Sequence, residues 1–177
     1  MRKRQFKKQI ICGTAALLLT SSSFSVFVSA EPRTDRSVQT AATPKFDKAL
    51  IERGRYIAKT AGCNDCHTPG YALTAGQVDE SQWLVGDSLG WEGPWGVTYP
   101  INIRLFMHEL TEQQWLSIAR SPARPPMPWF ALRDMTDQDL RAIYQYVRSL
   151  GPAGKPAPAY VPPGRAVQTP VVRMPAA

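Results

Sequence analysis

Residues 63–67 read Cys-Asn-Asp-Cys-His, and this pentapeptide determines how the rest of the chain is interpreted. It places two thiols two residues apart and an imidazole directly after the second thiol. The whole sequence of 177 residues holds three cysteines, which are too few for the disulfide framework of a small secreted module. The motif is therefore interpreted through the chemistry of two thiols and one imidazole.

The spacing Cys-x-x-Cys-His is typical of covalent haem attachment. Two thiols on one helical turn can add across the two vinyl groups of a porphyrin, and the next residue can then present its imidazole to the iron. We therefore expect one covalently bound haem c, with Cys63 and Cys66 as the attachment residues and His67 as an iron ligand.

Three other interpretations of the motif are weaker. A structural zinc site needs two further Cys or His ligands, and after residue 30 the chain offers only His108 outside the motif. A thioredoxin-like redox pair needs a β-α-β context, which the sequence does not suggest. A simple disulfide leaves unexplained both the histidine after Cys66 and the folding of the long loop that follows.

Helical periodicity predicts an all-α fold with at least three helices. The first covers residues 45–61, the second begins at Thr111 and ends before Pro122, and the third begins near Thr136 and ends at Gly151. Between them, residues 68–105 are rich in Gly, Pro and Trp and lack a steady period, which predicts a long loop. Prolines exclude a helix over residues 122–130, and no strands are expected.

The N-terminus reads as an export signal. Residues 1–30 combine a cationic start, an apolar run and a small-residue cleavage site before Glu31. Residues 31–44 are polar and aperiodic and predict a flexible leader. We expect the mature protein to be periplasmic. The alternative is an uncleaved segment at residues 9–30 that would anchor the protein to the membrane.

Composition excludes a nucleic-acid partner. The formal charge is +7, but residues 1–30 carry five cations and no acids, and the remaining chain has 16 basic and 14 acidic residues. A nucleic-acid binder needs a basic surface that survives processing. The predicted folded domain covers residues 45–151, and residues 152–177 hold seven prolines, which predict an extended tail.

The chain resembles the class I monohaem cytochrome c family over roughly residues 46–151. The resemblance rests on the Cys-Asn-Asp-Cys-His motif, the helix before it, Met127-Pro128, and the closing helix from Leu140. It implies helices and long loops wrapped around one haem. In that family a glycine and an aromatic residue lie where the first and last helices cross, and Gly54 and Tyr144 match those positions. The order of segments is also similar to cytochrome c units of periplasmic dehydrogenase complexes.

Met127 is the favoured sixth ligand of the iron. Its setting, Arg-Pro-Pro-Met-Pro-Trp, is stiff, so a thioether there loses little entropy on ligation, and the family places its axial methionine before the last helix. The other candidates are His108, Met107, Met135, Met174 and an open iron, but Met135 is expected to pack at the start of the third helix, and Met107 and His108 are more simply interpreted as a core residue and a surface imidazole. His/Met ligation would leave no site for oxygen or peroxide and would raise the reduction potential.

The resemblance therefore implies a one-electron carrier rather than an enzyme. We expect it to relay electrons from a dehydrogenase to an oxidase or another cytochrome of the respiratory chain. Two alternatives stay open: a five-coordinate haem enzyme or gas sensor, and a haem-bearing subunit of a larger dehydrogenase complex that docks through the proline-rich tail.

Further residues are expected around the haem. The family implies that a proline carbonyl accepts a hydrogen bond from His67, and Pro100 is the nearest match, although one extra residue separates it from the following asparagine. Candidate donors to the haem propionates are Trp91, Trp95, Tyr99, Asn102 and Arg104. Arg120, Arg124 and Arg133 flank the Met127 loop and are either solvated or a docking rim.

Overall fold

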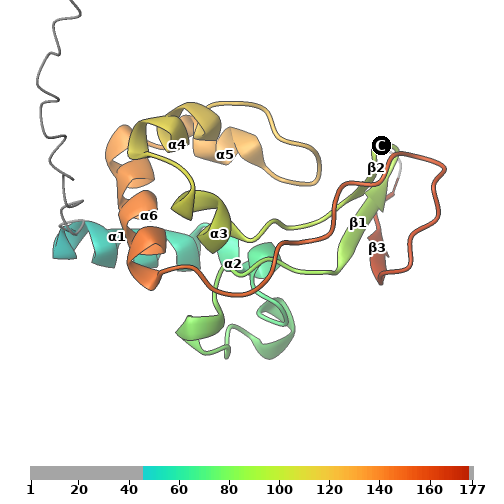
Figure 1. Ribbon diagram of the computed structural model, residues 1–177, viewed down its shortest axis with the longest axis horizontal. Coiled ribbons are helices and arrows are strands. Elements are labelled where there is room, and N and C mark those ends of the chain that lie inside the picture. The colour runs from blue at the N-terminus through green and yellow to red at the C-terminus, as the bar shows by residue number, and fades with distance from the viewer. Residues whose placement is uncertain (1–45, 176–177) are drawn as a thin grey trace, which may run out of the picture. The chain divides into compact units, whose positions relative to one another are not determined.

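The computed structural model describes residues 46–175. The predicted signal at residues 1–30 and the predicted flexible leader at residues 31–44 lie outside the described residues. The elements, in chain order, are α1 (Lys48–Thr60), α2 (Cys63–His67), η1 (Ala72–Thr74), η2 (Glu80–Gln82), β1 (Gly90–Gly93), β2 (Gly96–Thr98), α3 (Ile103–His108), α4 (Glu112–Ala119), α5 (Trp129–Asp134), α6 (Asp137–Leu150) and β3 (Val171–Arg173). The fold is mostly helical, as predicted, with one small sheet (Figure 1).

The three predicted helices form where the sequence provides caps. The Asp47 carboxylate accepts from the first turn of α1, and Thr136 caps α6. Thr111 and Gln114 form a reciprocal capping box at α4, which satisfies two backbone groups that a helix start otherwise leaves unpaired.

Helices α1 and α6 cross at Gly54. A Cβ on Gly54 would lie 2.0 Å from the Ala142 carbonyl oxygen and 2.7 Å from the Cβ of Tyr146, so a larger residue is sterically excluded there. The prediction of Gly54 at a close helix contact is confirmed, but the aromatic partner is Tyr146 and not Tyr144. Tyr144 is half-buried and donates its hydroxyl hydrogen to the Leu110 carbonyl at 2.7 Å.

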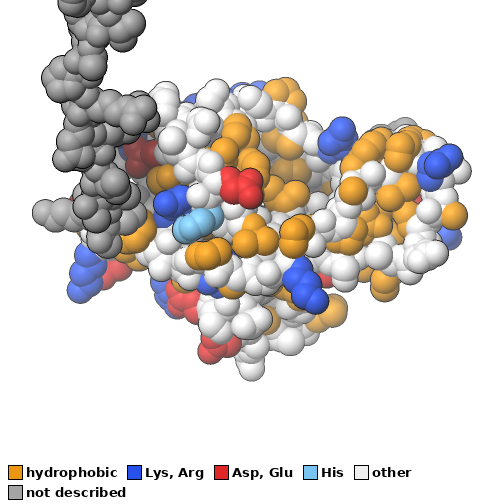
Figure 2. Space-filling model, in the orientation of Figure 1, with side chains coloured by type: hydrophobic (Ala, Val, Ile, Leu, Met, Phe, Trp, Pro, Cys, Tyr) orange, Lys and Arg blue, Asp and Glu red, His pale blue; other side chains and the backbone are white. Residues whose placement is uncertain are grey.

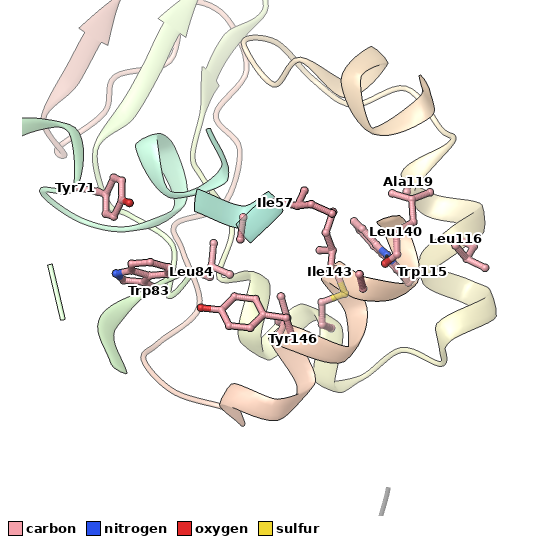
Figure 3. Packing of buried hydrophobic residues seen from close by; sticks show 14 residues of the cluster. Ile57, Tyr71, Trp83, Leu84, Trp115, Leu116, Ala119, Leu140, Ile143 and Tyr146 are labelled. Carbon is pink, nitrogen blue, oxygen red and sulfur yellow. Dashed lines mark hydrogen bonds between the residues drawn. The ribbon is translucent and has the colours of Figure 1, made fainter. Parts of the chain in front are cut away.

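The hydrophobic core lies between α1, α3, α4 and α6 and extends to the loop after α2 (Figure 3). Trp115 packs beside Leu140 and donates its indole N–H to the Leu140 carbonyl at 2.8 Å. Tyr71 and Trp83 meet edge to face, with ring centroids 5.6 Å apart. Met107 is fully buried within this cluster and His108 is exposed, which confirms that Met107 fills the core.

The sheet corrects the prediction that strands are absent. Strands β1 and β2 form an antiparallel hairpin in which Trp91 pairs with Thr98. Strand β3 comes from the segment that follows α6, residues 152–175, which is called the C-terminal segment below. It pairs in parallel with β1, so the sheet order is β2-β1-β3. Figure 1 shows the C-terminal segment leaving the end of α6 and crossing the molecule to reach this sheet.

The region predicted to contain no helix, residues 122–130, contains the start of α5 at Trp129. Pro128 is the residue before the first helical position, where its fixed φ and missing N–H do no harm. The predicted loop at residues 68–105 likewise contains short elements, of which α3 begins at Ile103. None of the helices in residues 46–175 has both the length and the apolar character needed to cross a bilayer.

Candidate haem-attachment site

The motif residues lie on α2, a helix of one and a half turns that begins after Gly62. Gly62 has φ +77, a left-handed conformation that glycine adopts without strain, and it lets the chain turn sharply from α1 into α2. Cys63 and Cys66 are half-buried and are not joined by a disulfide. The structure thus presents two separate thiols on one short helix.

The surroundings of the thiols disfavour a redox pair, and the donor set disfavours zinc. Burial raises the pKa of Cys63 to about 11 and also raises the pKa of Cys66, whereas redox-active cysteines have lowered pKa values in electropositive surroundings. In residues 46–175, no three side chains of His, Cys, Asp or Glu gather in a way that could hold a metal ion.

His67 is oriented by the backbone. Its Nδ1 lies 2.8 Å from the carbonyl oxygen of Ile101, and since a carbonyl can only accept, Nδ1 carries the hydrogen. Burial lowers the pKa of His67, and the bond to Ile101 opposes this effect in part. The ring is therefore a neutral imidazole at neutral pH, and the lone pair of Nε2 is left to coordinate a metal.

The carbonyl that orients His67 belongs to Ile101 rather than to Pro100, the residue expected from the resemblance. The Pro100 carbonyl instead accepts from the backbone N–H of Asp87 at 3.1 Å. The extra residue before Asn102 shifts the accepting carbonyl by one position. The function of the interaction is preserved, because any backbone carbonyl at this place fixes the ring and its tautomer.

Two polar residues outside the predicted set hold α2 in place. Thr68 donates its hydroxyl hydrogen to Asn64 Oδ1 at 2.8 Å and accepts from the Leu84 N–H at 2.8 Å. Both side chains are fully buried. Asn64 lies on α2 and Thr68 is its C-cap residue, and nothing in the sequence pattern singled them out.

Asn64 Nδ2 and Trp95 Nε1 are buried N–H donors without a hydrogen-bond partner in the described residues. A buried donor left unpaired is unfavourable by about 1–3 kcal/mol, so such groups mark places where a ligand can supply an acceptor. Two protonated thiols and one oriented imidazole on α2 fit a covalently attached haem, and a bound ligand could supply an acceptor to the Asn64 amide of the same helix.

Asn102 and Arg104, two of the predicted propionate donors, donate to backbone carbonyls in the structure. Asn102 caps α3 through Oδ1 and donates from Nδ2 to the carbonyls of Ala153 and Lys155, at 2.8 and 3.1 Å. Arg104 is buried and donates to the carbonyls of Ser81, Leu150 and Gly151. Asn102 thereby holds the C-terminal segment, and Arg104 joins η2 to the end of α6.

The aromatic candidates differ from one another. Tyr99 is engaged with Thr169, with 2.6 Å between their hydroxyl oxygens, whereas Trp95 retains its unpaired N–H. Trp91 is half-buried in β1. Trp95 is therefore the member of the predicted set with a buried N–H that has no partner in the described residues.

The arginines near Met127 are paired rather than forming a rim of unpaired cations. Arg120 contacts Asp137 at 2.6 Å and Arg133 contacts Asp134 at 2.7 Å. The Arg124 guanidinium lies over the ring of Tyr160. On the face shown in Figure 2, Lys and Arg side chains are separated from one another by hydrophobic and uncharged ones.

Met127 lies at the end of a tight turn before α5. Its backbone N–H donates to the Arg124 carbonyl at 3.2 Å, and its carbonyl accepts from the Trp129 N–H at 2.8 Å. The side chain is half-buried, whereas Met107 is fully buried and Met135 packs against the core at the start of α6. Residues 124–127 are called the methionine turn below.

Comparisons with known proteins identify the domain. The family described as "Cytochrome c" matches residues 51–151. The cytochrome c subunit of alcohol dehydrogenase (quinone) from Gluconacetobacter polyoxogenes is 30% identical over 128 residues, which cover 66% of this chain and 25% of that protein. The fructose dehydrogenase cytochrome subunit of Gluconobacter japonicus is 29% identical over 136 residues, covering 70% of this chain and 26% of the relative.

A third relative is one of the subunits of nicotinate dehydrogenase from Pseudomonas putida, 26% identical over 125 residues, or 64% of this chain and 10% of that protein. The matched region therefore spans about a quarter or less of the length of these relatives. No solved structure matches the chain.

Proposed function

Because this chain belongs to the cytochrome c family, we propose that it is a periplasmic one-electron carrier with His67 and Met127 as the two axial ligands of one haem c. The domain is an electron-transfer domain that resembles cytochrome subunits of dehydrogenases. The observation that supports His67 as an iron ligand is its hydrogen bond to the Ile101 carbonyl, which leaves the lone pair of Nε2 available.

Each residue of the proposed site has its own role. Cys63 and Cys66 hold the cofactor through two thioether bonds, and His67 supplies a nitrogen ligand whose orientation the Ile101 carbonyl fixes. A bound haem supplies an iron that gains and loses one electron. Met127 supplies a thioether from a turn whose backbone groups are already hydrogen-bonded. With His67 and Met127 both supplied by this chain as ligands, little rearrangement would accompany a change of charge on the iron.

The ligand assignment is tested by spectra of the ferric holoprotein. The wild-type protein should show the weak far-red charge-transfer band of methionine-ligated ferric haem. Met127→Leu should lose this band while keeping the haem, and its reduced form should bind carbon monoxide rapidly. Met135→Leu, which changes a methionine of the same region, should keep the band.

An identical spectrum for Met127→Leu would show that another residue is the sixth ligand. Rapid carbon monoxide binding by the reduced wild-type protein would instead support a five-coordinate enzyme or sensor.

We also propose that the electron donor is a dehydrogenase and that the acceptor is an oxidase or another cytochrome. The names of three relatives, each a subunit of a dehydrogenase, support this choice. The test is stopped-flow mixing of the oxidised protein with a quinone-dependent alcohol or fructose dehydrogenase and its substrate. Reduction that depends on substrate is expected, and its absence with every such enzyme would argue against this class of donor.

Export to the periplasm rests on the sequence of residues 1–30. Fractionation of cells expressing the full chain should place the protein in the periplasm, with Glu31 as its first residue by mass spectrometry. Recovery of the uncut chain in the membrane fraction would support the anchored alternative.

A further inference from the structure

The methionine turn is held from outside by two side chains. The Thr98 hydroxyl lies 2.7 Å from the Pro125 carbonyl oxygen and donates to it, and it also lies 3.5 Å from the Trp91 carbonyl. The Arg124 guanidinium carbon lies 4.3 Å from the centroid of the Tyr160 ring. One contact comes from strand β2 and the other from the C-terminal segment, which are more than sixty residues apart in sequence.

Thr98 and Tyr160, which make these two contacts, lie on two segments that are hydrogen-bonded to each other. Val97 and Val161 exchange two backbone hydrogen bonds of 2.8 and 3.0 Å, and the Tyr160 hydroxyl donates to the Trp95 carbonyl at 2.7 Å. Residues 95–98 with residues 160–161 are called the hairpin unit below. Because its two segments are directly bonded, Thr98 and Tyr160 are fixed relative to one another.

Gly96 makes this close pairing feasible. It has φ +96, and a Cβ there would lie 2.2 Å from the Val161 carbonyl oxygen. Only glycine combines that backbone conformation with so close an approach of a second chain segment. The glycine therefore serves the pairing of the hairpin with the C-terminal segment.

The C-terminal segment is itself held along its length. Asn102 donates to the Ala153 and Lys155 carbonyls, the Gly90 N–H donates to the Pro170 carbonyl at 2.9 Å, and β3 pairs with β1. The segment is thus held before and after Tyr160, and its path along the sheet is visible in Figure 1. The Tyr160 hydroxyl is bonded to the Trp95 carbonyl.

We propose that Thr98 and Tyr160 are positioning residues for Met127, and that the proline-rich C-terminal segment acts with the β1–β2 hairpin to hold the methionine turn against the haem iron. This inference rests on the proposed role of Met127 as sixth ligand. A ligand on a turn exchanges between bound and displaced states, and contacts present in the bound state raise its population. Thr98 and Tyr160 act on this exchange through the turn, without touching the iron.

Imidazole competition measures the displaced population directly. Exogenous imidazole binds ferric iron that Met127 has left, so its apparent affinity rises with that population. Thr98→Val removes the hydrogen bond with little change in shape. It should tighten imidazole binding about 2- to 12-fold, which corresponds to the net worth of one hydrogen bond. Thr98→Ser keeps the donor and should restore the wild-type affinity.

A matched control lies on α1. The Thr60 hydroxyl donates to the Tyr56 carbonyl at 2.8 Å on an exposed surface, so Thr60→Val removes the same kind of hydrogen bond without touching the methionine turn. Its imidazole affinity should equal that of the wild-type protein. An equal increase in Thr60→Val and Thr98→Val would overturn the proposal.

Tyr160 is tested by two substitutions of graded effect. Tyr160→Phe keeps the ring under Arg124 and loses the hydroxyl bond to Trp95, whereas Tyr160→Leu loses both. Imidazole affinity should rise more in Tyr160→Leu than in Tyr160→Phe, and the far-red band of Tyr160→Leu should vanish at a lower temperature than in the wild-type protein.

The result that would refute the ligand assignment differs from the result that would refute the positioning role. If Met127→Leu abolishes the far-red band but the Thr98 and Tyr160 variants match the wild-type protein, the ligand assignment stands and the positioning role is wrong. If the wild-type protein lacks the band, the ligand assignment fails, and the positioning role falls with it.

Discussion

The helix pair α1–α6 and the segments that surround the methionine turn are held together in different ways. The helices meet through apolar side chains and the missing side chain of Gly54. The loop segments, the hairpin and the C-terminal segment are joined by backbone pairing and by single polar side chains that reach backbone carbonyls, as Arg104, Asn102 and Thr98 do. The first kind of contact follows a periodic pattern, and the second leaves no pattern in the sequence.

This difference predicts that the helix crossing is the most sensitive point of the molecule. Gly54→Ala places a Cβ 2.0 Å from the Ala142 carbonyl oxygen, so the helices must separate, and the free energy of unfolding should fall by about 3 kcal/mol or more. Thermal unfolding followed by circular dichroism measures the loss.

Gly164→Ala is the control for this substitution. Gly164 has a positive φ, +76, but a Cβ at this position would have no atom within 4 Å, so the change is limited to backbone strain of about 1–2 kcal/mol. Equal losses in the two variants would show that the crossing at Gly54 is not tightly packed.

Arg104 should be the most sensitive position among the polar contacts. Arg104→Met removes hydrogen bonds to three carbonyls of η2 and the end of α6, and the expected loss of unfolding free energy is about 2–3 kcal/mol. Arg104→Lys should recover part of this, because one ammonium group cannot replace a planar guanidinium that bonds in three directions.

Arg141→Met is the matched control. Arg141 forms an ion pair with Glu112 on the surface, with both partners partly exposed, and such pairs contribute little. If Arg141→Met lowered the free energy of unfolding as much as Arg104→Met, this would contradict the view that hydrogen bonds to backbone carbonyls hold η2 and the end of α6 together.

Asn102 has two roles, capping α3 and holding the C-terminal segment, and one substitution can separate them. Asn102→Asp keeps an oxygen for the Leu105 N–H and loses the donor to the Ala153 and Lys155 carbonyls. Hydrogen exchange should therefore quicken in the C-terminal segment while α3 stays protected, and stability should fall by about 1–2 kcal/mol. Faster exchange confined to α3 would reverse the assignment.

Substitution of Asp139 should have the smallest effect on stability, and this effect should depend on pH. Its hydrogen bond to Arg53 joins α6 to α1 and lowers the pKa of Asp139. A carboxylate with a lowered pKa stabilises the fold above its unfolded pKa, and this contribution is lost as the pH falls through the folded pKa. Asp139→Asn should lower the melting temperature slightly at pH 7, and the difference should vanish in strong acid. A difference that grows on acidification would contradict the ion pair.

The helices with a clear apolar period could be predicted from the sequence, but which of their side chains makes a given contact could not. The helices at Lys48–Thr60 and Asp137–Leu150 follow from apolar spacing and caps. Tyr144 and Tyr146, however, lie on opposite flanks of the apolar stripe of α6, and the sequence does not indicate which flank meets Gly54. The structure assigns that role to Tyr146.

The site was predictable where chemistry fixes the residue types and unpredictable where the backbone supplies the contact. The spacing of Cys63, Cys66 and His67 specifies a chemistry by itself. A carbonyl acceptor such as that of Ile101 belongs to every residue, so the sequence could not distinguish it from that of Pro100. Arg104 was assigned to an anionic ligand because its charge was visible, whereas the three carbonyls that it contacts were not.

The assignment on which all the others depend is one haem bound through two thioether bonds at Cys63 and Cys66. It is tested by the pyridine haemochrome spectrum and the intact mass of the protein, expressed with a cytochrome c maturation system. We expect one haem per chain that survives denaturation, a spectrum of the type with both vinyl groups saturated, and loss of covalent haem in the Cys63→Ser, Cys66→Ser double variant. A folded wild-type protein that carries no covalent haem would refute the assignment.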